Sequence, residues 1–168
     1  MTEQPISPIV LNKMKELIIK SKKENIEYSA MVLSRLVKIT SGAEYQVEVF
    51  GEGVPIFHTH VYHKPLAATA DILEMVQSNR PSTYVGSLAT FSNIPIVNCY
   101  ELDSQSRDIL RKLINKIAIR DETVGSWIKG LNITLPLLVT TYKFYRKWNS
   151  TRAVLNWKVG YTAPGGRE

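Results

Sequence analysis

All three histidines of the 168-residue chain fall within six residues, at positions 58, 60 and 63. The segment Val54–His60 has the character of a β-strand, and side chains two residues apart on a strand share one face. The imidazoles of His58 and His60 can therefore reach a single metal ion. A His-x-His pair also occurs as an ordinary surface or core pair, so a metal site requires a third ligand nearby.

Asp71 is the candidate for that third ligand. It lies in the first turn of a helix expected from Thr69 to Ser78, and the loop before this helix can return the turn to the strand end. The free N–H groups at a helix start also stabilise a carboxylate. Catalytic zinc sites usually have three protein ligands and keep the fourth position for water. The sequence therefore predicts a zinc site formed by His58, His60 and Asp71.

The elements that must position these residues begin with a helix. Ser7-Pro8 is typical of a helix start, and apolar residues recur at helical spacing until about Asn25. Strands are then expected in three segments, 26–39, 45–50 and 54–60. The histidine pair thus lies at the end of the third strand.

The second half of the chain continues this alternation. A long amphipathic helix is expected from Asp103, which can cap it, to Ile119. Strands are expected on either side of it, at 84–89, 94–100, 133–142 and 153–159. The order of elements favours an α+β fold with a mixed sheet and packed helices. We expect one domain over residues 1–168, ending in a flexible tail at 163–168.

Composition narrows the class of protein. The hydrophobic fraction is 44%, which is enough for a buried core. No apolar stretch approaches the ~20 residues that cross a bilayer, and the first residues lack the layout of a signal peptide. The single cysteine, Cys99, cannot form an internal disulfide and fits a reducing compartment. These features predict a cytoplasmic protein without a membrane partner.

The arrangement of the candidate ligands resembles that of the JAMM family of zinc metalloproteases, also called MPN+ or JAB. The motif of that family is a glutamate, then His-x-His, then ten residues and an aspartate. His58-Thr59-His60 and Asp71 match this spacing, and Glu27, at the start of the first strand, fits the glutamate better than its rivals Glu44, Glu48 and Glu52. The resemblance covers about residues 26–102 and implies an MPN-like fold, followed by a C-terminal helix and strands at 103–162.

Two positions depart from the family pattern. The proline that usually follows the second histidine is Val61, and the serine three residues before the aspartate is Ala68. That serine helps to hold the oxyanion of the family's reaction, and loss of one such donor costs about 10²–10³ in rate. Thr69 could supply a hydroxyl from the next position. Zinc binding is therefore better supported than efficient catalysis.

The resemblance implies a zinc-dependent isopeptidase or peptidase that removes a ubiquitin-like modifier from its conjugates. Glu27 would act as the general base for a water acidified by zinc and would later protonate the leaving amine. The expected partner is a ubiquitin-like protein or a conjugate of one. The pair Gly165-Gly166 is also found in the tails of such modifiers, although a frayed terminus explains it equally well.

Three other functions remain open from the sequence. An inactive scaffold of the same fold is supported by Ala68. A metal-dependent nuclease or phosphoesterase barrel would need ~250 residues and further ligands. A nucleic-acid-binding protein is suggested by the net charge of +6 and by basic residues among aromatics at 143–148, although no recognised motif accompanies them and a solvated basic face is favoured. The oligomeric state does not follow from the sequence.

Overall fold

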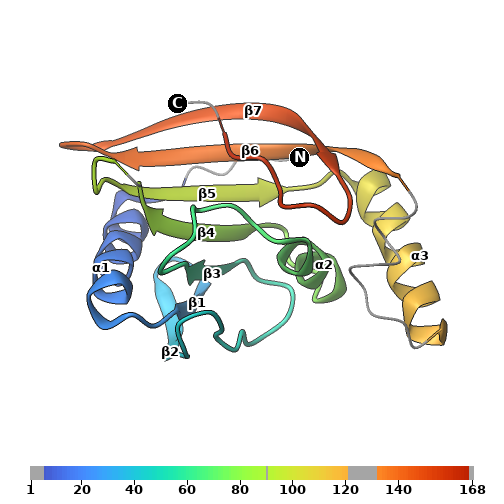
Figure 1. Cartoon of the computed structure of the whole chain (residues 1–168), viewed down its shortest axis with the longest axis horizontal. Helices are drawn as coiled ribbons and strands as arrows, with labels where there is room; N and C mark the ends of the chain where they lie inside the picture. Colours follow the sequence, from blue (N-terminus) through green and yellow to red (C-terminus); the bar gives the residue numbers. More distant parts are fainter. Residues whose placement is uncertain (1–5, 90, 121–131, 167–168) are drawn as a thin grey trace.

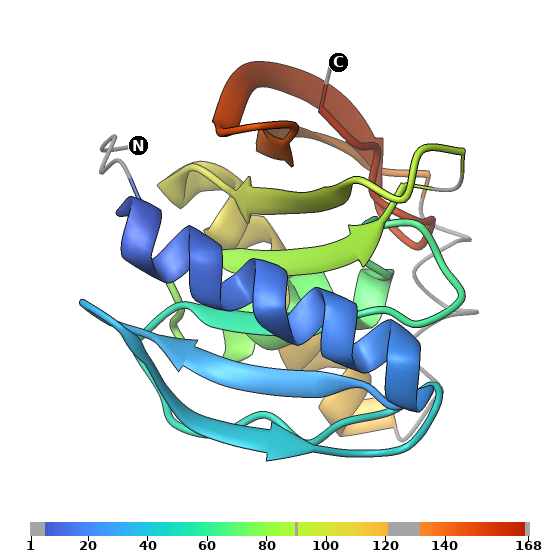
Figure 2. The same cartoon turned by 90° about the vertical axis from the view of Figure 1, so that its left-hand side faces the viewer.

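The computed structural model describes residues 6–89, 91–120 and 132–166, with the side chains of 117–120 left out. Its helices are α1 (Pro8–Glu24), α2 (Thr69–Gln77) and α3 (Ser104–Arg120). Its strands are β1 (Tyr28–Val32), β2 (Leu36–Ser41), β3 (Ile56–Thr59), β4 (Thr83–Leu88), β5 (Pro95–Glu101), β6 (Thr134–Phe144) and β7 (Trp148–Lys158). The strands form one mixed sheet with helices on both faces (Figures 1 and 2), which confirms the α+β class.

The sheet has the strand order β2-β1-β3-β4-β5-β6-β7. Neighbouring strands are antiparallel except β3 and β4, which run parallel. A parallel pair needs a crossover connection, and α2 provides it between β3 and β4. Within the described ranges, no helix combines the length and the apolar composition that a bilayer span requires.

Each face of the sheet packs against its own helices. Phe57 and Tyr84 contribute to a core beneath α1, together with Met14 of that helix. Val85 and Tyr100 contribute to the opposite core, beneath α2 and α3. Because successive side chains of a strand alternate between faces, His58 lies on the α2 side of β3, between Phe57 and Thr59 on the α1 side.

The predicted helix boundaries agree with the structure. Ser7 caps α1 by accepting a hydrogen bond from the backbone N–H of Val10 at 3.3 Å, and Asn25 ends the helix with a left-handed φ of 57°. Asp103 precedes α3 and accepts from the N–H of Ser106 at 2.8 Å. This hydrogen bond lowers the pKa of the Asp103 carboxyl group. Local capping chemistry is therefore sufficient to locate these two helices.

The predicted strand at 45–50 is wrong, because this segment is an irregular loop. The alternating apolar residues Val47 and Val49 face a pocket rather than a sheet core. Isolated contacts hold the loop: the Ser29 hydroxyl donates to the carbonyl of Glu48 at 2.6 Å, and the buried Arg80 guanidinium donates to Gly51 at 2.8 Å. The alternation of apolar and polar residues in this segment therefore arises because one side faces the pocket and the other faces solvent, although the segment is not a strand.

Residues 163–166, expected from the sequence to belong to a flexible tail, pack against the rest of the protein in the structure. Ala163 is fully buried, and its N–H donates to the carbonyl of Ala67 at 2.8 Å. A Cβ at position 166 would lie 1.9 Å from Oγ1 of Thr141, so only glycine fits there. We call Tyr161–Gly166 the C-terminal strap. Residues 167–168 lie outside the described part of the chain.

Candidate metal centre

The two histidine side chains meet at the carboxyl end of β3. Their Nε2 atoms lie 3.1 Å apart. The backbone N–H of His60 donates to the carbonyl of Gly86 at 2.9 Å, which extends the pairing of β3 with β4 by one residue. This pairing keeps His60 on the same face as His58, as the spacing of two residues predicted.

Asp71 reaches the same point from the first turn of α2. Its Oδ2 lies 3.7 Å from Nε2 of His58 and accepts a hydrogen bond from the N–H of Ala68 at 2.8 Å. The second contact is one half of a capping box, in which an acidic side chain reaches back to the residue before the helix. The carboxylate is therefore fixed by the helix start that it caps.

These three side chains fit a metal ion. One ligand atom from each of His58, His60 and Asp71 lies within 4.8 Å of the others. Two nitrogens bound to one tetrahedral zinc at about 2.0–2.1 Å would be separated by about 3.3 Å, close to the observed separation of the imidazoles. The predicted ligand set is thus brought together, and its chemistry of two imidazoles and one carboxylate suits zinc.

The tautomer of His60 supports this assignment. Its Nδ1 lies 2.9 Å from the carbonyl oxygen of Lys64, which can only accept a hydrogen bond. In the neutral ring, Nδ1 therefore carries the proton, and the lone pair of Nε2 faces His58. Burial lowers the pKa of His60 to about 4, and the charge of His58 adds to this effect. The ring is thus held neutral at pH 7, as a metal ligand must be.

Glu27 lies beside the three candidate ligands. β1 runs antiparallel to β3 with Ser29 opposite His58, so Glu27, two residues before Ser29, projects from the same face. The residue is 5% exposed and lines the same pocket as both histidines. Burial raises the pKa of its carboxyl group to about 7, and the negative charge of Asp71 contributes further.

A chain of hydrogen bonds fixes the backbone around Glu27. The N–H of Tyr28 donates to Oγ1 of Thr59 at 2.9 Å, and that hydroxyl donates to Ser21 of α1 at 2.7 Å. Ser21 in turn donates to the carbonyl of Ile26 at 2.6 Å. The last turn of α1, the start of β1 and the end of β3 are therefore locked together directly behind the site.

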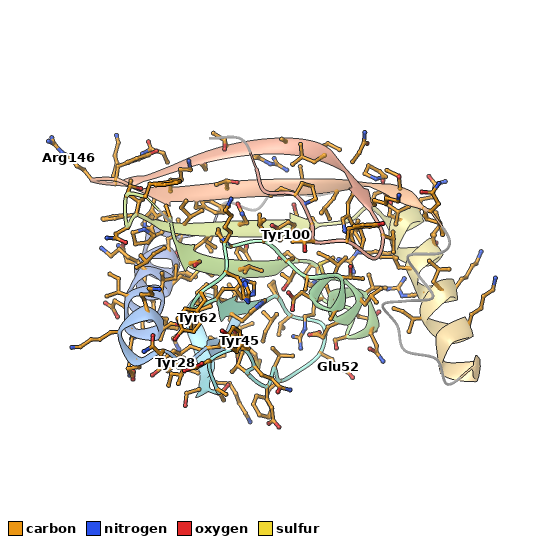
Figure 3. The ribbon with its side chains drawn as sticks, viewed as in Figure 1. Tyr28, Tyr45, Glu52, Tyr62, Tyr100 and Arg146 are labelled. Atoms are coloured by element: carbon orange, nitrogen blue, oxygen red, sulfur yellow. The ribbon has the colours of Figure 1, made fainter. Side chains whose placement is uncertain are left out.

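The pocket around these residues has a volume of about 600 Å³. Its polar groups are opposed by apolar side chains of Val47, Val49 and Leu66. Tyr45 lines one side of the pocket and packs against His63, and the ring of Tyr62 lies against Tyr45 with centroids 5.6 Å apart (Figure 3). His63 thus belongs to the aromatic rim of the pocket.

The hydroxyl expected to replace the missing serine is directed elsewhere. Oγ1 of Thr69 donates to the carbonyl of Tyr161 at 3.0 Å, and Thr69 does not line the pocket. Ala68 does line it, and so does Thr162 of the C-terminal strap. Sequence reasoning missed Thr162, because no local pattern connects it with a motif that ends at residue 71.

The rival glutamates lie away from the ligands. Glu44, Glu48 and Glu52 do not line the pocket, and Glu48 is engaged through its backbone carbonyl. Figure 3 shows Glu52 on the irregular loop between β2 and β3. Among the four candidates for the upstream glutamate, Glu27 is the one that lines the pocket of the three candidate ligands.

No protein-family model matches the sequence, and no curated protein or solved structure does.

Proposed function

We propose that this chain is a zinc-dependent isopeptidase or peptidase of the JAMM type, built on an MPN-like fold. The observation that supports this proposal is the meeting of His58, His60, Asp71 and Glu27 in one pocket. Glu27 is close enough to Asp71 for that carboxylate to raise its pKa.

In the proposed site, His58, His60 and Asp71 hold the metal ion. When bound, zinc supplies a Lewis acid that lowers the pKa of water to about 7 and polarises a carbonyl group. Glu27 accepts the proton of the attacking water and returns it to the leaving amine. A pKa near 7 suits both transfers, because the group can be ionised for the first and protonated for the second.

The proposed substrate is a conjugate of a ubiquitin-like protein. The apolar side chains of Val47, Val49 and Leu66 could accommodate an extended peptide segment against the polar wall of the pocket. The single cysteine, Cys99, is a free thiol, and a chain without a disulfide suits a reducing compartment such as the cytoplasm.

Two measurements test the proposal. The first is the zinc content of the purified protein, which we expect to be one ion per chain. The second is the rate at which the protein releases ubiquitin from the lysine side chain of a fluorescent peptide. Glu27→Gln should lower this rate by about 10²–10⁴ while zinc content is unchanged. Glu52→Gln removes the same charge outside the pocket and serves as the matched control.

Equal cleavage by wild type and Glu27→Gln would exclude Glu27 as the general base. Protein purified without zinc that also failed to bind added zinc would exclude the metal site. A rate lowered equally by Glu27→Gln and Glu52→Gln would show that charge, and not the position of Glu27, controls the reaction.

A metal-binding scaffold without activity is the second candidate function. It is favoured by Ala68, which places a methyl group where the family has a hydroxyl, and by the engagement of Thr69 with Tyr161. Stoichiometric zinc together with no cleavage of any conjugate would select this candidate. Recovery of cleavage in Ala68→Ser would show instead that the fold is competent and lacks one donor.

A further inference from the structure

Two basic segments that are distant in the sequence lie side by side in the structure. α1 and the turn between β6 and β7 both lie at the left-hand end of the molecule in Figure 1, the end that faces the viewer in Figure 2. Nζ of Lys15 lies 3.9 Å from the centroid of the Phe144 ring. Nε1 of Trp148 donates to Oδ1 of Asn12 at 3.1 Å. These contacts join the helix to the hairpin.

The positive charge of the protein is concentrated in these two segments. Residues 8–24 and 143–152 contain nine of the 21 Lys and Arg residues but two of the 15 acidic residues. The net charge of the whole chain is +6, so the remainder of the sequence has a net charge of −1. Both acids are engaged: Glu16 pairs with Lys13 at 3.1 Å, and Glu24 accepts from the Tyr28 hydroxyl. This end of the molecule is therefore suited to an anionic partner.

Aromatic rings accompany the cations at the turn. Tyr145 is 55% exposed and is followed by the exposed Arg146 and Lys147. Figure 3 shows Arg146 projecting from the end of the hairpin. The rings of Phe144 and Trp148 pack edge to face behind the turn, with centroids 5.3 Å apart, and so hold the base of the hairpin rigid.

We propose that this hairpin–α1 surface, formed by Lys15, Tyr145, Arg146, Lys147 and Trp148, binds single-stranded nucleic acid. The cations would contact backbone phosphates, and the exposed ring of Tyr145 would stack on a base. Both are the usual means by which proteins bind single strands without sequence preference. An acidic peptide would use the cations but would have no planar base to place on the tyrosine. Two strands separate β6 from β3, so this surface is separate from the metal centre.

The test measures binding of fluorescein-labelled oligo-dT and oligo-U by fluorescence anisotropy. The salt concentration is varied from about 50 to about 300 mM, a range over which electrostatic binding weakens steeply. We expect the logarithm of affinity to fall linearly with the logarithm of salt concentration, by about 0.7 for each phosphate contact on a single strand. Arg146→Ala/Lys147→Ala should reduce this slope by about 1.4. Lys112→Ala/Lys116→Ala removes the same charge from exposed positions on α3 and should leave the slope unchanged.

Substitutions of Tyr145 distinguish nucleic acid from other anionic partners, because only a base stacks on the tyrosine ring. Tyr145→Leu should weaken oligonucleotide binding by about 5- to 100-fold, whereas Tyr145→Phe keeps the ring and should bind as wild type does. Addition of EDTA should have no effect. The proposal is overturned by absence of binding at low salt, by equal losses in the α3 double variant, or by a Tyr145→Leu variant that binds as wild type does. Stronger binding to polyglutamate or to phosphatidylserine vesicles than to oligonucleotides would likewise overturn it.

Discussion

The two walls of the metal pocket are built in different ways. The sheet wall consists of Glu27 and His58, which are 5% and 6% exposed and are held by paired strands and by α1. The loop wall consists of residues 64–71, where the side chain of Asp71 is 27% exposed. Paired strands therefore form one wall, and an irregular segment that leads into the first turn of α2 forms the other.

The loop wall is held by contacts from distant parts of the chain. The carbonyl of Pro65 accepts from Nδ2 of Asn98 at 2.7 Å and from the Tyr100 hydroxyl at 3.2 Å. Ala67 pairs with Ala163 of the C-terminal strap. Since these contacts are few and separate, the two walls should respond differently to substitution and to removal of metal.

The largest effect on stability is expected from substitution of Arg80. This residue anchors the irregular loop between β2 and β3, whose residues Val47 and Val49 line the pocket. Its guanidinium is 1% exposed and contacts Glu74 and the carbonyls of Phe50, Gly51 and Val54. Arg80→Ala leaves these acceptors unpaired in a buried site and should lower the free energy of unfolding by about 3–5 kcal/mol. Urea denaturation measures this change. Arg80→Lys retains the charge and should lose less; a loss below about 1 kcal/mol in Arg80→Ala would show that the loop has no such anchor.

The next largest effect is expected from substitution of the candidate metal ligands, of which His58 lies on the sheet wall and Asp71 on the loop wall. His58→Ala and Asp71→Ala should each lower zinc affinity by more than about 100-fold, because loss of a partner beyond the ligands already costs 10–100-fold. Competition with a chromophoric chelator measures the affinity. His63→Ala is the matched control and should bind zinc as wild type does. If His63→Ala also lost zinc, the third ligand would have been assigned to the wrong residue.

A smaller effect follows from the buried acid of the sheet wall. The pKa of Glu27 is raised from 4.5 to about 7 in the folded protein, so folding favours its protonated form. The contribution of Glu27 to the free energy of unfolding is therefore fully present below pH 4.5 and is lost as pH rises through about 7. His60, with its pKa lowered from 6.5 to about 4, acts in the opposite sense and contributes its full stability above pH 6.5.

The window above pH 6.5 thus isolates Glu27. In metal-free protein, the free energy of unfolding should fall by about 1 kcal/mol between pH 6.5 and 8.5. The same measurement on Glu27→Gln should give a flat profile across this window. A wild-type profile that rises, or a variant that still falls, would show that Glu27 does not titrate in a buried environment.

The smallest effect is expected at the start of α2, on the loop wall. Ala68 has the extended backbone of an N-cap residue, with φ of −71° and ψ of 161°, but has no oxygen to accept a hydrogen bond. Ala68→Ser should complete the capping box with Asp71 and raise the free energy of unfolding by about 0.5–1 kcal/mol. Thermal denaturation measures this gain, and Ala68→Gly is the control. A serine that destabilised the protein would contradict the N-cap geometry.

The sheet wall could be predicted from the sequence because its information is local. A period of two places His58 and His60 on one face, and the helix that starts at Thr69, nine residues after His60, brings Asp71 to them from the loop wall. The position of Glu27 followed from a family motif, and its catalytic role remains a prediction. The limits of α1 and α3 followed from the capping residues Ser7 and Asp103.

Apart from Asp71, the loop wall could not be predicted, because long-range contacts define it. Nothing near Thr69 in the sequence indicates that its hydroxyl bonds to Tyr161. Nothing near Ala163 indicates that it is buried, since the surrounding glycines and polar residues are typical of a frayed end. The same applies to Arg80, whose backbone carbonyl acceptors lie on a loop more than twenty residues earlier. Such pairs depend on the order of the strands in the sheet.

The contact between Ala67 and Ala163 also sets a time order during synthesis. The ribosome produces Glu27, His58, His60 and Asp71 in the first half of the chain, but the strap that secures the loop wall emerges near residue 163. A nascent chain therefore carries the three candidate metal ligands long before the strap can secure the loop wall. We therefore expect a chain truncated before Ala163 to hold a metal ion at the candidate site less tightly than the full chain does.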